Sequence, residues 1–145
     1  SVIDPSDIAS FDLRERIASD LSGFSGARAP VVLGFERDMA SRVADAHVVV
    51  GKAGGLTVSE TLTAGRPMIV VGAVPGNEEL NEELVTAGGA GYACEPHQVG
   101  WYLAKMRGDG EIVARGARAR KLVRHHAAER VLAVALGREP FARVA

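Results

Sequence analysis

Short apolar runs alternate with amphipathic stretches along most of this chain. Two of the runs, His47–Val50 and Met68–Val74, are continuously apolar, which predicts strands that are buried on both faces of a sheet. Pro30–Leu33 and Tyr92–Cys94 are shorter runs and also predict strands. Because helix-like stretches separate the strands, the pattern favours an α/β fold with a Rossmann-like, doubly wound parallel sheet.

Apolar positions spaced three or four residues apart predict the helices between these strands. The predicted helices are Asp12–Leu21, Glu36–Ala44, Thr57–Ala64, Glu78–Ala87, Gln98–Met106 and Glu111–Leu136, the last as one helix or two. The residues after Gly137 (138–145) are expected to form a loose tail. The pattern therefore predicts a single α/β domain.

The composition excludes several classes of protein. The chain has 145 residues, of which 47% are hydrophobic and 24% charged, as is typical of a globular domain. A net charge of −1 argues against a nucleic-acid partner. The lone Cys94 excludes a disulfide framework and a multi-cysteine zinc site, and it fits a reducing, cytoplasmic location. No apolar run is long enough to predict a membrane span.

The loops that follow the strands are the places where a ligand is expected, because open α/β sheets bind ligands beyond the carboxyl ends of their strands. The candidate loops are Gly34–Asp38, Gly51–Thr57 and Val74–Asn81. In the second loop, Gly54 and Gly55 allow the backbone to approach a ligand closely, and a helix follows at once. A helix N-terminus favours a phosphate group, and Lys52 would add a positive charge.

A plain tight turn before a well-capped helix is the alternative interpretation of the same loop. Thr57 and Glu60 have the spacing of a capping box, in which the glutamate accepts a hydrogen bond from the backbone of the first residue. Neither a Walker loop nor a Gly-x-Gly-x-x-Gly motif occurs in the chain. The pattern alone therefore leaves phosphate binding and simple capping open.

Several motifs between Gly34 and Ala90 occur together in one known family. They are Gly34-Phe35 with Met39, then Asp45, Lys52–Glu60, Gly65–Met68, Pro75–Glu78 with Asn81, and Gly88–Gly91. In this order and spacing the sequence resembles the C-terminal half of the family-28-type glycosyltransferases. These include the lipid I N-acetylglucosaminyltransferase, the monogalactosyldiacylglycerol synthases and the processive diacylglycerol glucosyltransferases. The opening Lys52-Ala53-Gly54 is more similar to the glycolipid enzymes than to the peptidoglycan enzyme.

The resemblance implies a GT-B architecture, with two Rossmann-like domains that face each other across a cleft. Residues 1–145 would be the domain that binds the nucleotide-sugar donor, with 1–29 matching poorly. The N-terminal acceptor domain would lie outside this chain. We therefore expect about one half of a two-domain enzyme.

The resemblance also implies the residues that bind the donor. Gly34 and Phe35 would hold uracil, while Glu60 would accept hydrogen bonds from both ribose hydroxyls. The remaining donor-binding residues would be Lys52, Gly54, Gly55, Leu56 and Thr57 around the diphosphate, and Gly76, Asn77, Glu78 and Asn81 around the sugar. Asn77 departs from the glutamine that is common in the family, so the identity of the sugar stays open.

The activity implied by the resemblance is inverting transfer of a hexosyl group from a UDP-sugar to a lipid acceptor. The general base would come from the N-terminal half, so no catalytic residue is assigned, and the isolated chain is expected to bind the donor without turnover. No Asp-x-Asp pair is present, and neither a metal nor a cofactor is predicted. A nucleotide-sugar epimerase half and a non-catalytic nucleotide-sugar-binding module are the alternative functions.

Other polar and aromatic residues have structural interpretations. The basic residues of the C-terminal helical stretch are expected to form a solvated helix face. They are Arg115, Arg118, Arg120, Lys121, Arg124 and Arg130. Contact with anionic lipid headgroups at the inner face of the membrane is the alternative for this cluster. Cys94 is predicted to be a small core residue, Trp101 a packing residue, and His47 and His97 structural.

Overall fold

The computed structural model describes residues 15–23, 30–72, 76, 78–123 and 127–138. The chain divides into two compact units, Ser1–Met39 and Ala40–Ala145. In the first unit a helix occupies 15–20, which confirms part of the predicted helix at Asp12–Leu21. The predicted strand at Pro30–Leu33 is wrong: these residues form no regular structure, and Val31 is 79% exposed. An apolar run without a neighbouring strand has no partner for its backbone groups.

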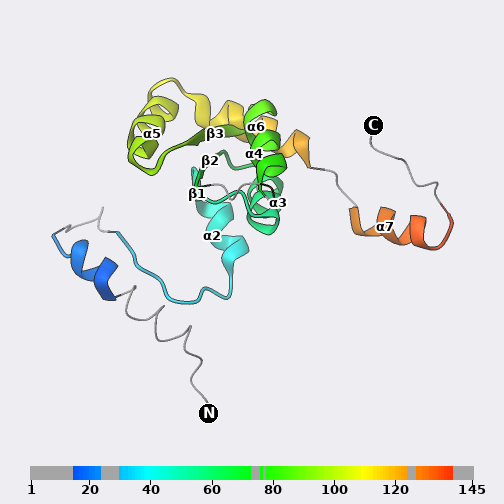
Figure 1. Cartoon of the computed structure of the whole chain (residues 1–145), viewed down its shortest axis with the longest axis horizontal. Helices are drawn as coiled ribbons and strands as arrows, with labels where there is room; N and C mark the ends of the chain where they lie inside the picture. Colours follow the sequence, from blue (N-terminus) through cyan, green and yellow to red (C-terminus); the bar gives the residue numbers. More distant parts are fainter. Residues whose placement is uncertain (1–14, 24–29, 73–75, 77, 124–126, 139–145) are drawn as a thin grey trace, which may run out of the picture. The chain divides into compact units, whose positions relative to one another are not determined.

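The second unit is built on a parallel sheet. Its strands are β1 (Val49–Gly51), β2 (Met68–Val71) and β3 (Gly91–Cys94), in the order β1-β2-β3 (Figure 1). β2 is central, and Met68, Ile69 and Val70 are buried as predicted. The expectation that His47–Val50 is buried on both faces is wrong, because β1 is an edge strand of this sheet and Val50 is 42% exposed.

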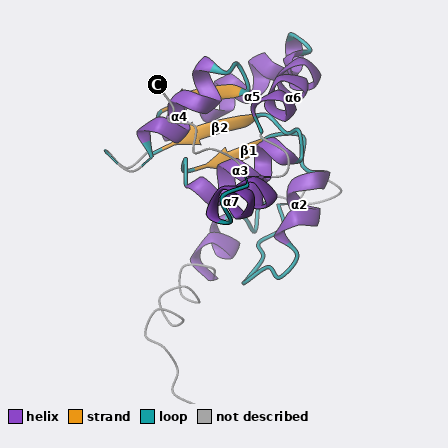
Figure 2. Ribbon diagram, turned by 90° about the vertical axis from the view of Figure 1, so that its right-hand side faces the viewer, coloured by secondary structure: helices purple, strands orange, loops and turns teal. Residues whose placement is uncertain are grey.

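Helices flank the strands, as Figure 2 shows. The helices of the chain are α2 (Met39–Asp45), α3 (Gly55–Thr63), α4 (Glu79–Ala87), α5 (Val99–Gly108) and α6 (Glu111–Leu122), with a 3-10 turn at Pro96–Gln98, and α7 (Ala127–Ala135), which buries no side chain. Each corresponds to a predicted helix, with ends shifted by up to a few residues. The predicted stretch Glu111–Leu136 forms two helices. Parallel strands with flanking helices make this a Rossmann-like α/β fold.

The hydrophobic core lies where α3, α4 and α6 pack against one face of β2. Its fully or almost fully buried members are Ala53, Val58, Leu62, Met68, Val70, Val85, Ala90 and Ala119. Met68 and Val70 share this face because side chains alternate along a strand. Ile69 points to the opposite face and is also fully buried. Burying a side chain of this size contributes about 1.5–3 kcal/mol, so the central strand anchors the unit.

α6 packs against the segments that lead into β2 and β3. Arg115 donates hydrogen bonds to the carbonyl oxygens of Gly89 (3.2 Å) and Gly91 (3.3 Å). Gly116 lies against the carbonyl oxygen of Gly65, just before β2. α6 therefore covers the amino edge of the sheet, by which we mean the end where β2 and β3 begin. The loops after β1 and β2 lie at the opposite end, the carboxyl edge.

Candidate functional site

The loop after β1 leads directly into α3. Gly54 is the N-cap residue of this helix, with φ −62° and ψ 139°, and the cap makes no side-chain hydrogen bond. The first backbone bond of the helix runs from Val58 N–H to the Gly54 carbonyl, at 2.9 Å. The N–H groups of Gly55, Leu56 and Thr57 have no partner among the described residues, and these residues are exposed. A free helix N-terminus of this kind presents N–H donors and the positive end of the helix dipole.

The structure excludes the capping-box interpretation of Thr57 and Glu60. Because α3 begins at Gly55, Thr57 is its third residue rather than its N-cap. Within the described part of the chain, no hydrogen bond holds the half-buried Glu60 side chain. Glu60 instead borders a shallow hollow of about 290 Å³ between α2 and α3. The other lining residues are Ala40, Val43, Ser59, Thr63 and Ala64.

The start of α4 lies beside this loop. Asn81, in the first turn of α4, donates a hydrogen bond of 2.9 Å from Nδ2 to the carbonyl oxygen of Ala53. Glu78 is the N-cap residue of α4, and its Oε1 lies 3.9 Å from the position that a Cβ on Gly54 would take. The predicted diphosphate loop and two of the predicted sugar-binding residues are therefore neighbours.

Among the described residues, neither packing nor backbone conformation explains why residues 54 and 55 are glycines. A Cβ on Gly54 would meet atoms no closer than 3.9 Å, and one on Gly55 would meet Asn81 Nδ2 at 3.8 Å, which are ordinary contacts. The φ of neither residue lies in the left-handed region. The bare backbone here is thus available to a molecule that approaches from outside.

The remaining predicted binding residues belong to both units of the chain. Gly34 and Phe35 belong to the first unit, and Phe35 is 94% exposed. Asn77 lies outside the described residues. Lys52 and Leu56 are exposed beside Gly54, and Gly76 has a positive φ of 86° that suits glycine. No cluster of metal-ligating side chains occurs among the residues that the structure describes.

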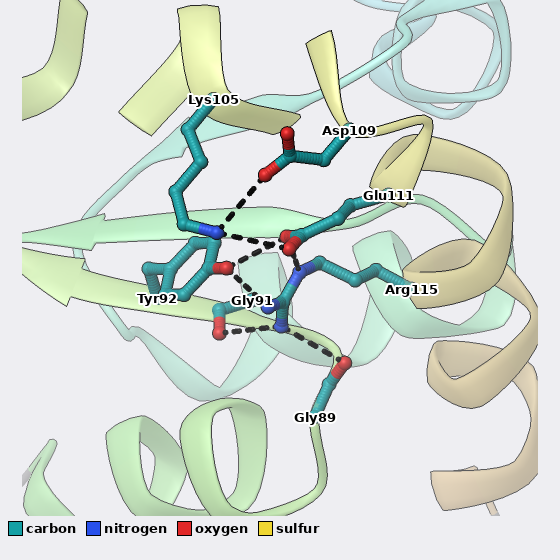
Figure 3. Close-up of polar contacts among 7 residues, drawn as sticks. All are labelled: Gly89, Gly91, Tyr92, Lys105, Asp109, Glu111 and Arg115. Atoms are coloured by element: carbon teal, nitrogen blue, oxygen red, sulfur yellow. Dashed lines mark hydrogen bonds and ion pairs between the residues drawn. The ribbon is translucent and has the colours of Figure 1, made fainter. Parts of the chain in front are cut away.

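A second polar cluster, at the junction of β3, α5 and α6, was missed by the sequence reasoning (Figure 3). The Tyr92 hydroxyl donates to Glu111 Oε2 at 2.6 Å, and Arg115 Nε donates to the same oxygen at 2.7 Å. Arg115 also donates to the Tyr92 hydroxyl, and Lys105 Nζ lies 3.1 Å from Glu111 Oε1. We call Tyr92, Lys105, Glu111 and Arg115 the clasp.

The hydrogen bonds of the clasp stabilise the charged form of Glu111. The bond from Tyr92 and those from Arg115 and Lys105 lower the pKa of Glu111 from 4.5 to about 2. The bonds to Glu111 and Asp109 raise the pKa of Lys105. The prediction that Arg115 belongs to a solvated helix face is therefore wrong. The i,i+4 spacing of Glu111 and Arg115 was the available signal.

Two further expectations for single side chains need correction. Trp101 makes a T-shaped contact with the neighbouring Tyr102 ring, but it is 61% exposed, so it packs at the surface. Cys94 is half-buried at the end of β3 rather than in the core, and burial followed by the charge of Glu95 raises its pKa. Cys94 is the last residue of β3 and Trp101 lies in the first turn of α5, and at neither position does an apolar residue type ensure burial.

Comparison with known proteins identifies the class of this chain. Residues 14–99 match the model of the glycosyltransferase family 28 C-terminal domain, and the chain belongs to this family. The sequence comparison thus agrees with the resemblance that its motifs suggested. No helix in the described part of the chain is long and apolar enough to cross a membrane.

Relatives from two branches of the family are similar to this chain. It is 31% identical over 126 residues to the UDP-N-acetylglucosamine–N-acetylmuramyl-(pentapeptide) pyrophosphoryl-undecaprenol N-acetylglucosamine transferase of Methylobacterium sp. (strain 4-46), covering 81% of this chain and 34% of that protein. The enzyme of the same name from Granulibacter bethesdensis is 35% identical over 82 residues, or 54% of this chain and 20% of the relative. The processive diacylglycerol beta-glucosyltransferase of Staphylococcus saprophyticus is 33% identical over 70 residues, which cover 48% of this chain and 17% of the relative. The chain spans about a third or less of these relatives.

A solved structure confirms the fold. The crystal structure of the glycotransferase of kitacinnamycin superposes with a TM-score of 0.58 over 97% of this chain and 41% of that chain. Its sequence identity of 16% means that the likeness concerns the Rossmann-like arrangement of strands and helices.

Proposed function

We propose that this chain binds the UDP-sugar donor of a glycosyltransferase that acts on a lipid-type acceptor. Membership of the family and the names of its relatives support a sugar transferase and favour it over an epimerase. The observation that carries the proposal is the set of features that lie together at the carboxyl edge of the sheet. There the free N-terminus of α3, two glycines that the fold does not require, Glu78 and Asn81 lie together.

The diphosphate is proposed to bind at the start of α3. Gly54 and Gly55 let the phosphates approach the backbone, and the N–H groups of Gly55, Leu56 and Thr57 donate hydrogen bonds to them. As the sugar leaves, negative charge grows on UDP, and these fixed donors and the helix dipole stabilise it. Lys52 adds a mobile positive charge at the same loop. In this proposal backbone donors take the place of a metal ion.

The nucleoside and the sugar are proposed to lie on either side of the diphosphate. Glu60, in the hollow between α2 and α3, accepts hydrogen bonds from the two ribose hydroxyls. Gly34 and Phe35 hold uracil, and Gly76, Asn77, Glu78 and Asn81 surround the sugar. A carboxylate suits the ribose because one group can accept from two neighbouring hydroxyls.

The reaction itself needs a part of the enzyme that lies beyond this domain. An acceptor hydroxyl attacks the anomeric carbon, the bond from that carbon to the UDP oxygen breaks, and a general base takes the hydroxyl proton. We propose that a preceding acceptor domain supplies this base. The isolated chain then binds UDP-sugars without transferring a hexosyl group. A cytoplasmic site of action, peripheral at the inner face of the membrane, fits an acceptor that is a lipid.

Calorimetric titration of the chain with UDP tests the proposal. We expect saturable binding that Glu60→Ala weakens at least about tenfold, because the ribose hydroxyls lose their acceptor. Glu83→Gln, on the exposed surface of α4, is the matched control and should bind as the parent chain does. Absence of heat with the parent chain, or equal binding by Glu60→Ala, would contradict the proposal.

A further inference from the structure

Asn81 holds a buried backbone carbonyl that has no other hydrogen-bond donor among the described residues. Ala53 is fully buried, and its carbonyl oxygen receives no backbone N–H bond within the described residues. The hydrogen bond of 2.9 Å from Asn81 Nδ2 provides the missing donor. A buried carbonyl left without a donor is unfavourable, so this contact has a structural purpose at the loop before α3.

The carbonyl of Ala53 and the N–H of Gly54 belong to one planar peptide unit. Holding the carbonyl therefore also fixes the direction of the Gly54 N–H. If the unit turned over, the φ of Gly54 would move from −62° to a positive value, which glycine tolerates and other residues rarely adopt. Gly54, which lets a ligand approach the backbone, also lets the peptide unit between Ala53 and Gly54 rotate easily. A residue from another part of the chain is therefore needed to hold this peptide unit in place.

We propose that Asn81 is a positioning residue, which anchors the peptide unit between Ala53 and Gly54 and so orients the Gly54 N–H, next to the free N–H groups at the start of α3, toward a nucleoside diphosphate. This rests on the proposed function. It extends the sequence-based interpretation of Asn81 as a contact to the sugar. After bonding Ala53, the amide of Asn81 still has one N–H and its Oδ1. The same side chain can thus connect the diphosphate loop with the sugar side of the site.

An NMR titration of Asn81→Ala with uridine, UDP and UDP-N-acetylglucosamine separates these roles. We expect the affinity for uridine to stay within about twofold, and that for UDP to fall at least about tenfold. The affinity for UDP-N-acetylglucosamine should fall by at least as much as that for UDP. An unchanged UDP affinity would mean a contact to the sugar alone, and an equal loss for uridine would mean general damage to the site. Either result overturns the inference.

Amide hydrogen exchange gives a readout that needs no ligand. Asn81→Asp keeps the shape of the side chain but replaces the N–H donor by an acceptor, so it serves beside Asn81→Ala. We expect faster exchange in both variants at Val58, whose N–H bonds to the Gly54 carbonyl, with the Glu83→Gln control like the parent chain. Unchanged exchange in both variants overturns the anchor. If the parent chain binds no UDP, the proposed function fails, and the exchange result alone decides the anchor.

Discussion

At the amino edge of the sheet, glycines touch their neighbours. A Cβ on Gly91 would collide with the backbone of Met68, and one on Gly116 would press on the carbonyl of Gly65. At the carboxyl edge, a Cβ on Gly54 or Gly55 would make only ordinary contacts with the described residues. The same residue type therefore has two meanings in one domain. At the amino edge glycine lets one segment of the chain pack closely on another, whereas at the carboxyl edge no described residue packs closely on the glycines.

The amino edge should be the more sensitive to added volume. Gly91→Ala places a methyl group against the backbone of the central strand β2, which cannot move aside without breaking the sheet. We expect the free energy of unfolding to fall by about 3 kcal/mol or more, measured by urea denaturation.

Gly100→Ala is the matched control for this experiment. Gly100 lies in α5, where an added Cβ meets nothing within 4 Å. This variant should be as stable as the parent chain or more stable by about 0.5 kcal/mol, because alanine favours the helix. Equal stability of Gly91→Ala and Gly100→Ala would remove the distinction between packed and open glycines.

The carboxyl edge should show the opposite response. Gly55→Ala meets only Asn81 Nδ2 at 3.8 Å, so its free energy of unfolding should stay within about 0.5 kcal/mol of the parent value. The affinity for UDP should fall at least about tenfold, because the methyl group occupies the approach to the helix N-terminus. Calorimetry and urea denaturation on one preparation measure both. A destabilised variant, or one that binds UDP normally, contradicts this assignment.

The clasp gives the amino side of the domain a dependence on pH. The pKa of Glu111 in the folded chain is about 2, below its ordinary value of 4.5. Its contribution to stability is therefore complete above about pH 4.5 and is lost as the pH falls toward 2. Glu111→Gln should be less stable than the parent chain at pH 7, and the difference should shrink across this range.

Thermal unfolding between pH 7 and pH 2 measures the effect. Glu83→Gln is the control, because it removes a carboxylate that has no such partners among the described residues. A constant difference between Glu111→Gln and the parent chain over this range would show that the charge of Glu111 does not stabilise the clasp.

The sequence predicted the strands of the sheet and the helices between them, because continuous apolar runs and helical spacing are local signals. It could not distinguish a central strand from an edge strand: Val50 and Ile69 occur in similar runs, and only the neighbouring strands decide their burial. Arg115 was missed for a related reason. Its partners Tyr92 and Gly89 are far away in the sequence, and only the fold brings them to α6.

The candidate site was predicted as a set of residues, but not as an arrangement. The motifs indicated the loop before α3 and the start of α4, and the structure brings them together. Thr57 was expected as an alternative cap because its side chain suits one, yet α3 begins earlier, at Gly55. The bond from Asn81 to Ala53 has no local pattern, since the two residues are separated by 28 positions.

The proposed function depends most on where a nucleotide binds to this domain. An amide NMR spectrum of the labelled chain, recorded while UDP is added, tests this directly. We predict saturable shifts at the amides of Gly54, Gly55, Leu56 and Thr57, and unchanged signals around Gly65, Gly89 and α6. Shifts confined to the amino edge, or no saturable shifts at any concentration, would contradict the assignment of the carboxyl edge as the donor site.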